Sequence, residues 1–294
     1  MAALVDCNVH LWDQAANPIF WLTDRTLVRD MLGNYDSLPG SYTLADYRRD
    51  VAGHDVRGIV WSDAGADDPI AAAAWVQAQC DELDVPGALV TLGDPADQGF
   101  TELVDRFRAL PLALSVRVRL VPALARAAAE RTLLDDDSAM ANLELLAKHG
   151  LVATLEATGN QLDVVAQLAH TLPALRIVLD HFGWPTSPTE KELGPHRERL
   201  SAIAAATNTA TRIDAIGTIF GDWTTDRVRP WLRAATDTFG ADRCMLGSDM
   251  PIERLRSGFG RLYEAYGSIY SDLTDGARAA LFGGTAQRWY RVGT

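Results

Sequence analysis

Short apolar runs alternate with helix-like segments from one end of the chain to the other. The runs are rich in Val, Ile and Leu, which is typical of strands that are buried on both faces. Between them, apolar residues recur with helical spacing. The predicted strands cover residues 3–7, 56–61, 87–92, 113–120, 152–156, 176–179, 212–216 and 244–247. The predicted helices cover residues 69–83, 98–110, 138–149, 161–171, 190–207 and 225–239.

This order of elements predicts an α/β protein in which strands and helices alternate. Eight such strands over 294 residues favour a (β/α)8 TIM barrel, formed by residues 1–294 as one domain. A doubly wound open sheet is the alternative, but that fold usually carries a glycine-rich phosphate turn after its first strand. Here the first strand is followed by Asn8, Val9 and His10, without glycine.

One segment, residues 13–50, is an insertion after the first strand and shows no regular periodicity. It contains Phe20, Trp21, Tyr35 and Tyr42, and this aromatic content argues against disorder. In a barrel, this connection leaves from the face where active sites lie. We expect a lid or a pocket wall, with an arm that packs for stability or in a homodimer as the alternative.

Polar side chains gather at the predicted carboxyl ends of three strands. Asn8 and His10 follow the first strand, His181 follows the sixth and Asp249 follows the eighth. Asn8 and His10 are two residues apart, so both side chains face the same way in an extended chain. Because the strands of a barrel end at one common face, we predict that these four residues form the active site.

Five further residues are candidates for substrate binding. Arg117 and Arg119 share one face of the fourth strand and could hold a carboxylate, with an internal ion pair to Glu156 as the alternative. Asp214, near the end of the seventh strand, is an additional acid without a firm role. Trp21, in the insertion, is a candidate pocket wall.

Composition and charge narrow the range of partners. Apolar residues make up 48% and charged residues 22% of the chain, and the net charge is −12. An acidic surface argues against nucleic acid or an anionic membrane as the main partner, which leaves a small-molecule substrate. The chain begins without a basic, apolar leader and contains no apolar stretch of about 18 residues, so we expect a cytoplasmic protein. Cys7, Cys80 and Cys244 lack paired spacing, and Cys7 and Cys244, which lie in apolar strand-like runs, are expected to be buried thiols.

Three strand-end motifs carry a resemblance to a known family. DCNVHLWD, VLDHFGWP and MLGSDMP resemble the strand-1, strand-6 and strand-8 motifs of the amidohydrolase superfamily. Within it, the chain is similar to the lactonase-like amidohydrolase 2 group, which includes sugar-lactone lactonases and 2-pyrone-4,6-dicarboxylate lactonase. Residues 17–21 resemble the aromatic loop of that group, residues 115–117 its Gly-x-Arg motif and residues 281–290 its closing signature. The resemblance spans almost the whole chain and implies a barrel-shaped hydrolase.

Asn8 departs from the metal-binding pattern of the superfamily, in which strand 1 carries His-x-His. An amide oxygen is a poor zinc ligand, so we predict a site without a metal cofactor, with zinc or another divalent metal as the alternative. The resemblance then implies that His10, His181 and Asn8 polarise a substrate carbonyl. Asp249 would take a proton from the attacking water.

The predicted function is that of a lactonase-type hydrolase that opens a small, acidic lactone without a metal. Four alternatives remain open on the same barrel: a metal-dependent amidohydrolase, a decarboxylase, a lactone isomerase and a ligand-binding homologue without catalysis. Asn8 counts against the decarboxylase, because the resemblance implies a metal and a complete strand-1 motif for that activity. A carboxylate at position 249 counts against a purely binding role.

Overall fold

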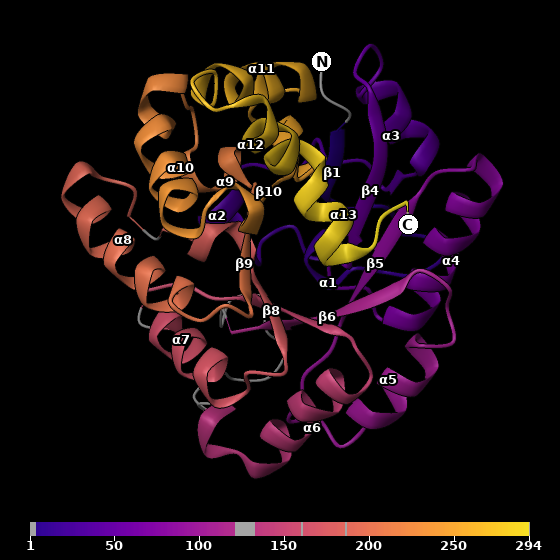
Figure 1. Ribbon diagram of the computed structural model, residues 1–294. Coiled ribbons are helices and arrows are strands. Elements are labelled where there is room, and N and C mark those ends of the chain that lie inside the picture. The colour runs from indigo at the N-terminus through magenta and orange to yellow at the C-terminus, as the bar shows by residue number, and fades with distance from the viewer. Residues whose placement is uncertain (1–3, 121–132, 160, 186, 294) are drawn as a thin grey trace.

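Eight parallel strands form the central sheet of the protein, in the order β1-β4-β5-β6-β7-β8-β9-β10 (Figure 1). The computed structural model describes residues 4–120, 133–159, 161–185 and 187–293. The strands are β1 (Leu4–Val9), β4 (Val56–Ser62), β5 (Gly87–Leu92), β6 (Ala113–Arg119), β7 (Val152–Glu156), β8 (Arg176–Leu179), β9 (Thr209–Ile213) and β10 (Cys244–Leu246).

Helices surround the ring of strands on the outside (Figure 1). They bury their apolar faces against the outer faces of the strands, as in other (β/α)8 barrels. The main helices are α4 (Pro69–Leu83), α5 (Phe100–Phe107), α6 (Asp137–Lys148), α7 (Gln161–Thr171), α8 (Glu190–Ala204), α10 (Thr225–Phe239) and α11 (Phe259–Ile269). No helix in the described part of the chain is both long and apolar enough to span a membrane.

The ring closes where β1 and the segment after β10 lie side by side. The amide of Asp249 donates to the carbonyl of Asn8 (2.9 Å), and the amide of His10 donates to the carbonyl of Met250 (2.8 Å). Val9 and Met250 form a parallel bridge at the same place. The TIM-barrel prediction is therefore confirmed, and closure brings three predicted site residues together.

The predicted elements agree with the observed ones within a few residues, with one larger error. The seventh strand was predicted over residues 212–216 but is Thr209–Ile213. Ala215 has a left-handed backbone (φ 55°), and the apolar residues after it form the short helix α9 (Ile216–Phe220) instead of a strand. Apolar runs this short do not distinguish strand from helix, which explains the error. Asp214 consequently lies directly after the strand.

The insertion after β1 is more regular than its sequence predicts. Residues 13–50 include the helices α1 (Phe20–Thr23), α2 (Arg29–Leu32) and α3 (Leu44–Asp50), and the strand β3 (Ser41–Tyr42), which pairs with β2 (Trp12–Asp13). A capping box between Thr43 and Asp46 begins α3. Aromatic side chains hold the segment together: the rings of Trp12 and Trp21 lie 6.1 Å apart and those of Trp21 and Tyr35 lie 5.8 Å apart.

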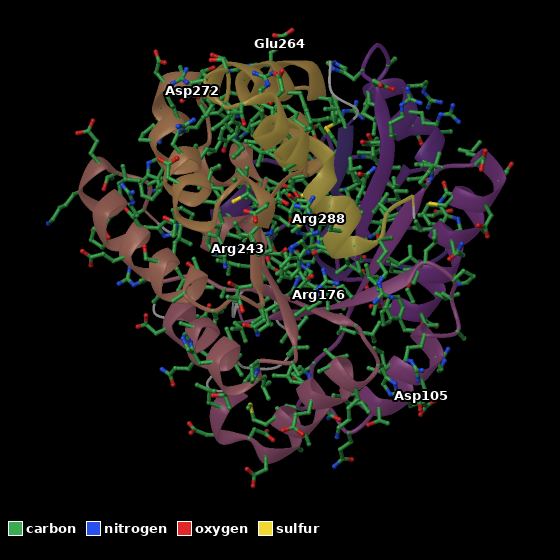
Figure 2. All side chains as sticks on the ribbon, in the orientation of Figure 1. Asp105, Arg176, Arg243, Glu264, Asp272 and Arg288 are labelled. Carbon is green, nitrogen blue, oxygen red and sulfur yellow. The ribbon has the colours of Figure 1, made fainter. Side chains whose placement is uncertain are left out.

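The C-terminal helix α13 (Thr285–Tyr290) covers the opposite end of the barrel, where the strands begin. It crosses in front of the strands in Figure 1 and contributes Trp289 and Tyr290 to an inner apolar cluster that draws on all eight strands. In Figure 2, Arg176 and Arg243 lie near Arg288, which belongs to this helix. The guanidinium of Arg176 lies 4.5 Å from the centre of the Trp289 ring and donates to the carbonyl of Arg288. These contacts fix α13 to the barrel.

Candidate active site

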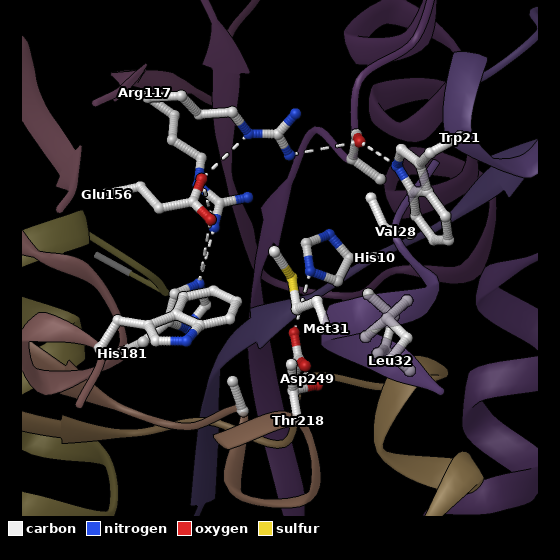
Figure 3. A pocket seen from close by; sticks show the side chains of 15 residues that line it. His10, Trp21, Val28, Met31, Leu32, Arg117, Glu156, His181, Thr218 and Asp249 are labelled. Atoms are coloured by element: carbon white, nitrogen blue, oxygen red, sulfur yellow. Dashed lines mark hydrogen bonds and ion pairs between the residues drawn. The ribbon is translucent and has the colours of Figure 1, made fainter. Parts of the chain in front are cut away.

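A pocket opens at the carboxyl ends of the strands, on the face opposite α13. Side chains from the ends of seven strands, all but β5, and from the insertion converge on it (Figure 3). It is lined by His10, Trp21, Val28, Met31, Leu32, Ala64, Arg117, Arg119, Glu156, His181, Trp184, Ala215, Thr218, Asp249 and Ile252. Of the nine site residues predicted from the sequence, seven line this pocket, and the other two, Asn8 and Asp214, lie directly behind its polar wall.

Asp249 Oδ1 lies within hydrogen-bond distance of two neighbours, one on β1 and one just after it. Asn8 Nδ2 donates to Asp249 Oδ1 over 3.1 Å, and His10 Nε2 lies 3.1 Å from the same oxygen. His10 Nδ1 lies 2.7 Å from the carbonyl oxygen of Ser62, which can only accept, so Nδ1 carries a proton. The amide of Asn8 thus presents its NH2 group to the carboxylate.

The backbone of Asp249 is held in a left-handed conformation, with φ at 61°. Asp6, a buried carboxyl on β1, accepts the amide hydrogen of Ser248 (2.7 Å) and the hydroxyl hydrogen of Tyr47 (2.8 Å). Ser248 Oγ accepts the amide hydrogen of Met250 in turn. Burial raises the pKa of Asp6 to about 6, although these hydrogen bonds oppose the shift. Asp6 thus links the insertion to the turn that carries Asp249.

His181 forms the second half of the polar wall, and its backbone is also left-handed (φ 50°). Its Nδ1 lies 2.5 Å from Asp214 Oδ1, and its Nε2 lies 2.9 Å from a guanidinium nitrogen of Arg117. Because the guanidinium can only donate, Nε2 accepts and Nδ1 carries the proton. Burial opposes protonation of the ring, but the carboxylate of Asp214 outweighs it, and the pKa of His181 is raised.

The two predicted substrate arginines are both engaged in internal ion pairs. Arg117 Nε donates to Asp180 Oδ2 (2.6 Å), and Arg117 also lies 3.3 Å from Glu156 Oε2. Arg119 Nε donates to the same glutamate oxygen over 2.9 Å. Burial opposes ionisation of both acids, but the arginines outweigh it, so the pKa of Glu156 is lowered and that of Asp180 falls to about 2. Of the two roles open at the sequence level, the structure shows the internal ion pair.

Sequence reasoning did not assign a role to Asp180 or to Arg212. Arg212 Nε donates to Asp180 Oδ1 (2.7 Å), and its Nη1 donates to the carbonyl oxygen of Cys7 and to Ser62 Oγ. It thereby connects three strands beneath the pocket. Their positions in the sequence could have indicated a role in the site, because Arg212 is two residues before Asp214 and Asp180 directly precedes His181. The error in the bounds of the seventh strand hid this relation for Arg212.

The rest of the pocket wall is apolar and comes mainly from the insertion. Val28, Met31 and Leu32 contribute their side chains, and Trp21 stands among them with its Nε1 donating to the carbonyl oxygen of Ala64 (2.8 Å) (Figure 3). Of the two roles considered for the insertion, the structure shows a pocket wall. Trp21 was expected there, whereas the three aliphatic residues carry no sequence pattern that marks them.

The donor set does not fit a metal ion as the side chains are arranged. Among the described residues, no three His, Cys, Asp or Glu side chains converge in a way that could hold one. His181 Nε2 is directed at the cationic guanidinium of Arg117 (2.9 Å), which would repel a metal cation at that nitrogen. Asn8 directs its NH2 group, which cannot ligate, at Asp249.

Polar side chains gathered at the carboxyl ends of the strands are the arrangement of active sites in TIM-barrel enzymes. Residues 5–292 match the family model described as amidohydrolase, and the chain belongs to this family. The resemblance inferred from the strand-end motifs is confirmed.

Two curated proteins are similar to this chain in sequence. The uncharacterized protein y4mH of Sinorhizobium fredii is 26% identical over 304 residues, covering 99% of both chains. The L-fucono-1,5-lactonase of Burkholderia ambifaria is 32% identical over 165 residues, covering 54% of this chain and 56% of that protein. The second of these relatives supports the lactonase-like branch.

Solved structures share the fold. A crystal structure of an amidohydrolase from Burkholderia multivorans with bound zinc superposes on this chain with a TM-score of 0.82 and 22% sequence identity. The match covers 99% of this chain and 100% of that chain. Amidohydrolase 2 from Bifidobacterium longum subsp. infantis has a TM-score of 0.71 and 21% identity, with 99% and 100% covered. At this identity the likeness shows the fold alone.

Proposed function

We propose that this protein hydrolyses a small lactone, with Asp249 as the base that activates water. The observation that carries the proposal is the position of the Asp249 carboxylate, which is held by Asn8 and His10 and lies across the pocket from Arg117 and His181. A carboxylate that faces hydrogen-bond donors across a pocket suits attack of water on an ester carbonyl. Similarity over about half of the chain to an L-fucono-1,5-lactonase supports a lactone as the substrate.

The contacts suggest a division of roles. Asn8 and His10 both reach Asp249 Oδ1, so we assign them to holding the carboxylate, in place of the carbonyl contact that the sequence predicts. Asp249 Oδ2 accepts a proton from water while the water oxygen bonds to the lactone carbonyl carbon. The guanidinium of Arg117, which is held in place by His181 Nε2, stabilises the oxyanion. The ring C–O bond then breaks, the alkoxide takes the proton from Asp249, and a hydroxy acid results.

We further propose that the lactone is uncharged, which revises the acidic substrate predicted from the sequence. Arg117 and Arg119 are already neutralised by Glu156 and Asp180. A second carboxylate in the same pocket would compete with these buried acids and lose much of its hydration. The aliphatic wall formed by Val28, Met31 and Leu32 favours an uncharged ring as well.

The proposal includes catalysis without a metal, because the His181–Arg117 contact and the orientation of Asn8 do not suit metal binding. The experiment compares the purified protein before and after treatment with a chelator, on matched pairs of uncharged and carboxylated lactones. Acid release is followed with a pH indicator, and metal content is measured by elemental analysis. We expect turnover of uncharged lactones that survives the chelator.

Asp249→Asn is expected to lower kcat by roughly 10²- to 10⁴-fold, the range for loss of a general base. Asp272→Asn, which removes an exposed partner of Arg233, serves as the control and should keep full activity. Turnover that requires added zinc or manganese would instead indicate a metallohydrolase. If Asp249→Asn keeps both ligand binding and turnover, the hydrolytic role of this carboxylate is wrong.

A further inference from the structure

Thr218 is the one residue of helix α9 that the fold leaves partly exposed. The other residues of this helix are buried: Ile216, Gly217, Ile219 and Phe220. Thr218 is half-buried and lines the candidate active site, so its exposed part faces the pocket. No step of the proposed hydrolysis uses it.

The hydroxyl of Thr218 has no hydrogen-bond partner among the described residues. A threonine within a helix usually donates to a carbonyl three or four residues earlier. Thr236 on α10 does so, and its Oγ1 donates to the carbonyl oxygen of Leu232 over 3.1 Å. The unpaired side-chain atoms that are sealed inside the described part of the chain do not include Thr218 Oγ1. This hydroxyl is therefore unpaired and open to the pocket.

Thr218 lies on the side of the pocket that carries Asp249. The amide of Gly217 donates to Glu253 Oε2 (2.7 Å), and the amide of Glu253 donates to the carbonyl oxygen of Asp249 (3.1 Å). Figure 3 accordingly shows Thr218 beside Asp249, with Arg117 across the pocket. Asp249 Oδ2 is also absent from the sealed, unpaired atoms. The carboxylate and the hydroxyl thus both open on this side.

The proposed reaction leaves one oxygen of its intermediate without a donor. Attack of water gives a tetrahedral carbon that bears three oxygens. The oxyanion faces Arg117 and the oxygen from water lies at Asp249, so the ring oxygen is the one that remains. As an alkoxide it is about as basic as hydroxide, whose conjugate acid, water, has a pKa of about 16. Such a group leaves slowly unless a donor stabilises the charge that develops on it.

Trp184 offers another open donor, but on the opposite wall. Its Nε1 has no hydrogen-bond partner among the described residues and is not among the sealed atoms. Its ring packs edge-on against the imidazole of His181, with 4.8 Å between the ring centres. His181 in turn bonds Arg117, so Trp184 belongs to the wall that faces the oxyanion. Thr218 is the open donor on the side where Asp249 returns its proton.

We propose that the hydroxyl of Thr218 donates a hydrogen bond to the ring oxygen of the lactone as the C–O bond breaks. This role rests on the proposed lactone hydrolysis and adds the group that stabilises its leaving oxygen. The electron pair of the C–O bond passes to the ring oxygen, which takes the proton that Asp249 removed from water. Thr218 keeps its own proton, and lactone and water give one hydroxy acid.

Two uncharged lactones with six-membered rings, δ-valerolactone and dihydrocoumarin, test the proposal. Opening the first releases an alkoxide, whereas opening the second releases a phenoxide, whose conjugate acid has a pKa of about 10 and which leaves without help. Thr218→Val keeps the shape of the side chain but removes the hydroxyl. It should lower kcat on δ-valerolactone roughly tenfold or more, the range for a hydrogen bond to a charged group, and kcat on dihydrocoumarin by no more than about twofold.

Three further variants serve as matched controls. Thr218→Ser keeps the hydroxyl and should retain the wild-type ratio of the two kcat values. Thr171→Val, at the exposed end of α7, removes a hydroxyl that does not line the pocket and should leave both rates unchanged. Trp184→Phe removes the donor on the opposite wall and should change both rates by the same factor. Circular dichroism verifies that each variant is folded.

The outcomes separate the role of Thr218 from lactone hydrolysis itself. An unchanged kcat of Thr218→Val on δ-valerolactone, an equal loss on both lactones, or a loss that Thr218→Ser shares would each overturn the role of Thr218 alone. A changed ratio in Trp184→Phe but not in Thr218→Val would also overturn it, because the leaving oxygen would then face Trp184. If the unchanged protein turns over neither lactone, the proposed function is wrong and the role of Thr218 with it.

Discussion

Asp214 shows how a single side chain behind the pocket can control one that lines it. It does not line the pocket, but its Oδ1 holds His181 Nδ1 at 2.5 Å and its charge raises the pKa of that ring against the effect of burial. A carboxylate in this position keeps the proton on Nδ1, so that Nε2 can accept from Arg117, the donor that we assign to the oxyanion. We therefore regard Asp214 as a positioning residue.

Asp214→Asn is expected to lower kcat by roughly 10²-fold, because His181 loses its orientation and no longer holds the guanidinium of Arg117. Since Asp214 raises the pKa of His181 and the neutral ring is the form that accepts from Arg117, removal of Asp214 should move the acidic limb of the pH–rate profile to lower pH. A pH series of kcat measures both effects. The exposed Asp163→Asn serves as the control. A lower kcat with an unmoved profile would mean that Asp214 acts only through the fold.

Glu253 is a second buried carboxyl near the site, and it shows what burial costs at the residue scale. It accepts hydrogen bonds from the amide of Gly217 (2.7 Å), from Trp223 Nε1 (3.2 Å) and from Ser257 Oγ (2.7 Å). Burial nevertheless raises its pKa to about 7, with a further contribution from the charge of Asp249. Glu253 thus joins α9 to the segment that follows Asp249.

A carboxyl whose pKa is higher in the folded than in the unfolded protein contributes stability below its unfolded pKa and loses it as pH rises through the folded pKa. For Glu253 this window runs from its usual value of 4.5 to about 7. At about 1.4 kcal/mol per pKa unit, the free energy of unfolding falls by about 3 kcal/mol across this window. Urea unfolding at several pH values should show a shallower decline for Glu253→Gln, and no change for the exposed Glu264→Gln. If the free energy of unfolding depends on pH in the same way in the wild type and in Glu253→Gln, the raised pKa of Glu253 is wrong.

At the scale of elements, the insertion is the part of the fold that shapes the pocket. Its short helices carry Val28, Met31 and Leu32 to the rim, and Trp21 is fastened to the loop after β4 through the carbonyl oxygen of Ala64. The aromatic contacts of Trp21 with Trp12 and Tyr35 make the segment part of the core. It therefore forms a packed wall on one side of the pocket.

Trp21→Phe keeps an aromatic ring but removes the hydrogen bond to Ala64. This hydrogen bond contributes about 1 kcal/mol to holding the pocket wall in position, so its loss should raise KM roughly fivefold, with kcat less affected. Steady-state kinetics on an uncharged lactone measures the change. Leu27→Ala, at an exposed position of the same insertion, is the matched control. An unchanged KM for Trp21→Phe would mean that this wall does not contact the substrate.

At the scale of the whole molecule, the two ends of the barrel have different tasks. The carboxyl ends of the strands carry the polar site, while α13 closes the other end with Trp289 and Tyr290 packed into the inner cluster. Arg176 stacks on Trp289 and ties the helix to the beginning of β8. Stability and catalysis should therefore respond to different substitutions.

Trp289→Ala is expected to destabilise the protein by about 3 kcal/mol, because it leaves a cavity and removes the contact with Arg176. Urea unfolding followed by circular dichroism measures the loss. Activity per folded molecule at low temperature should stay within about twofold, since small effects on a remote site lie below 0.5 kcal/mol. A large fall in kcat per folded molecule would show that the two ends of the barrel are coupled.

The sequence by itself determined the order of strands and helices, the insertion and the strand-end positions of His10, His181 and Asp249. These features depend on short-range periodicity and on the rule that strand ends meet at one face of a barrel. Tertiary structure alone decided the partners of each charged group. Asn8 and Asp249 are 241 residues apart, and Arg117 binds Glu156 and Asp180 instead of remaining available for an anionic substrate. The reason is that pairing between buried charges depends on distances of a few ångströms, which only closure of the barrel sets.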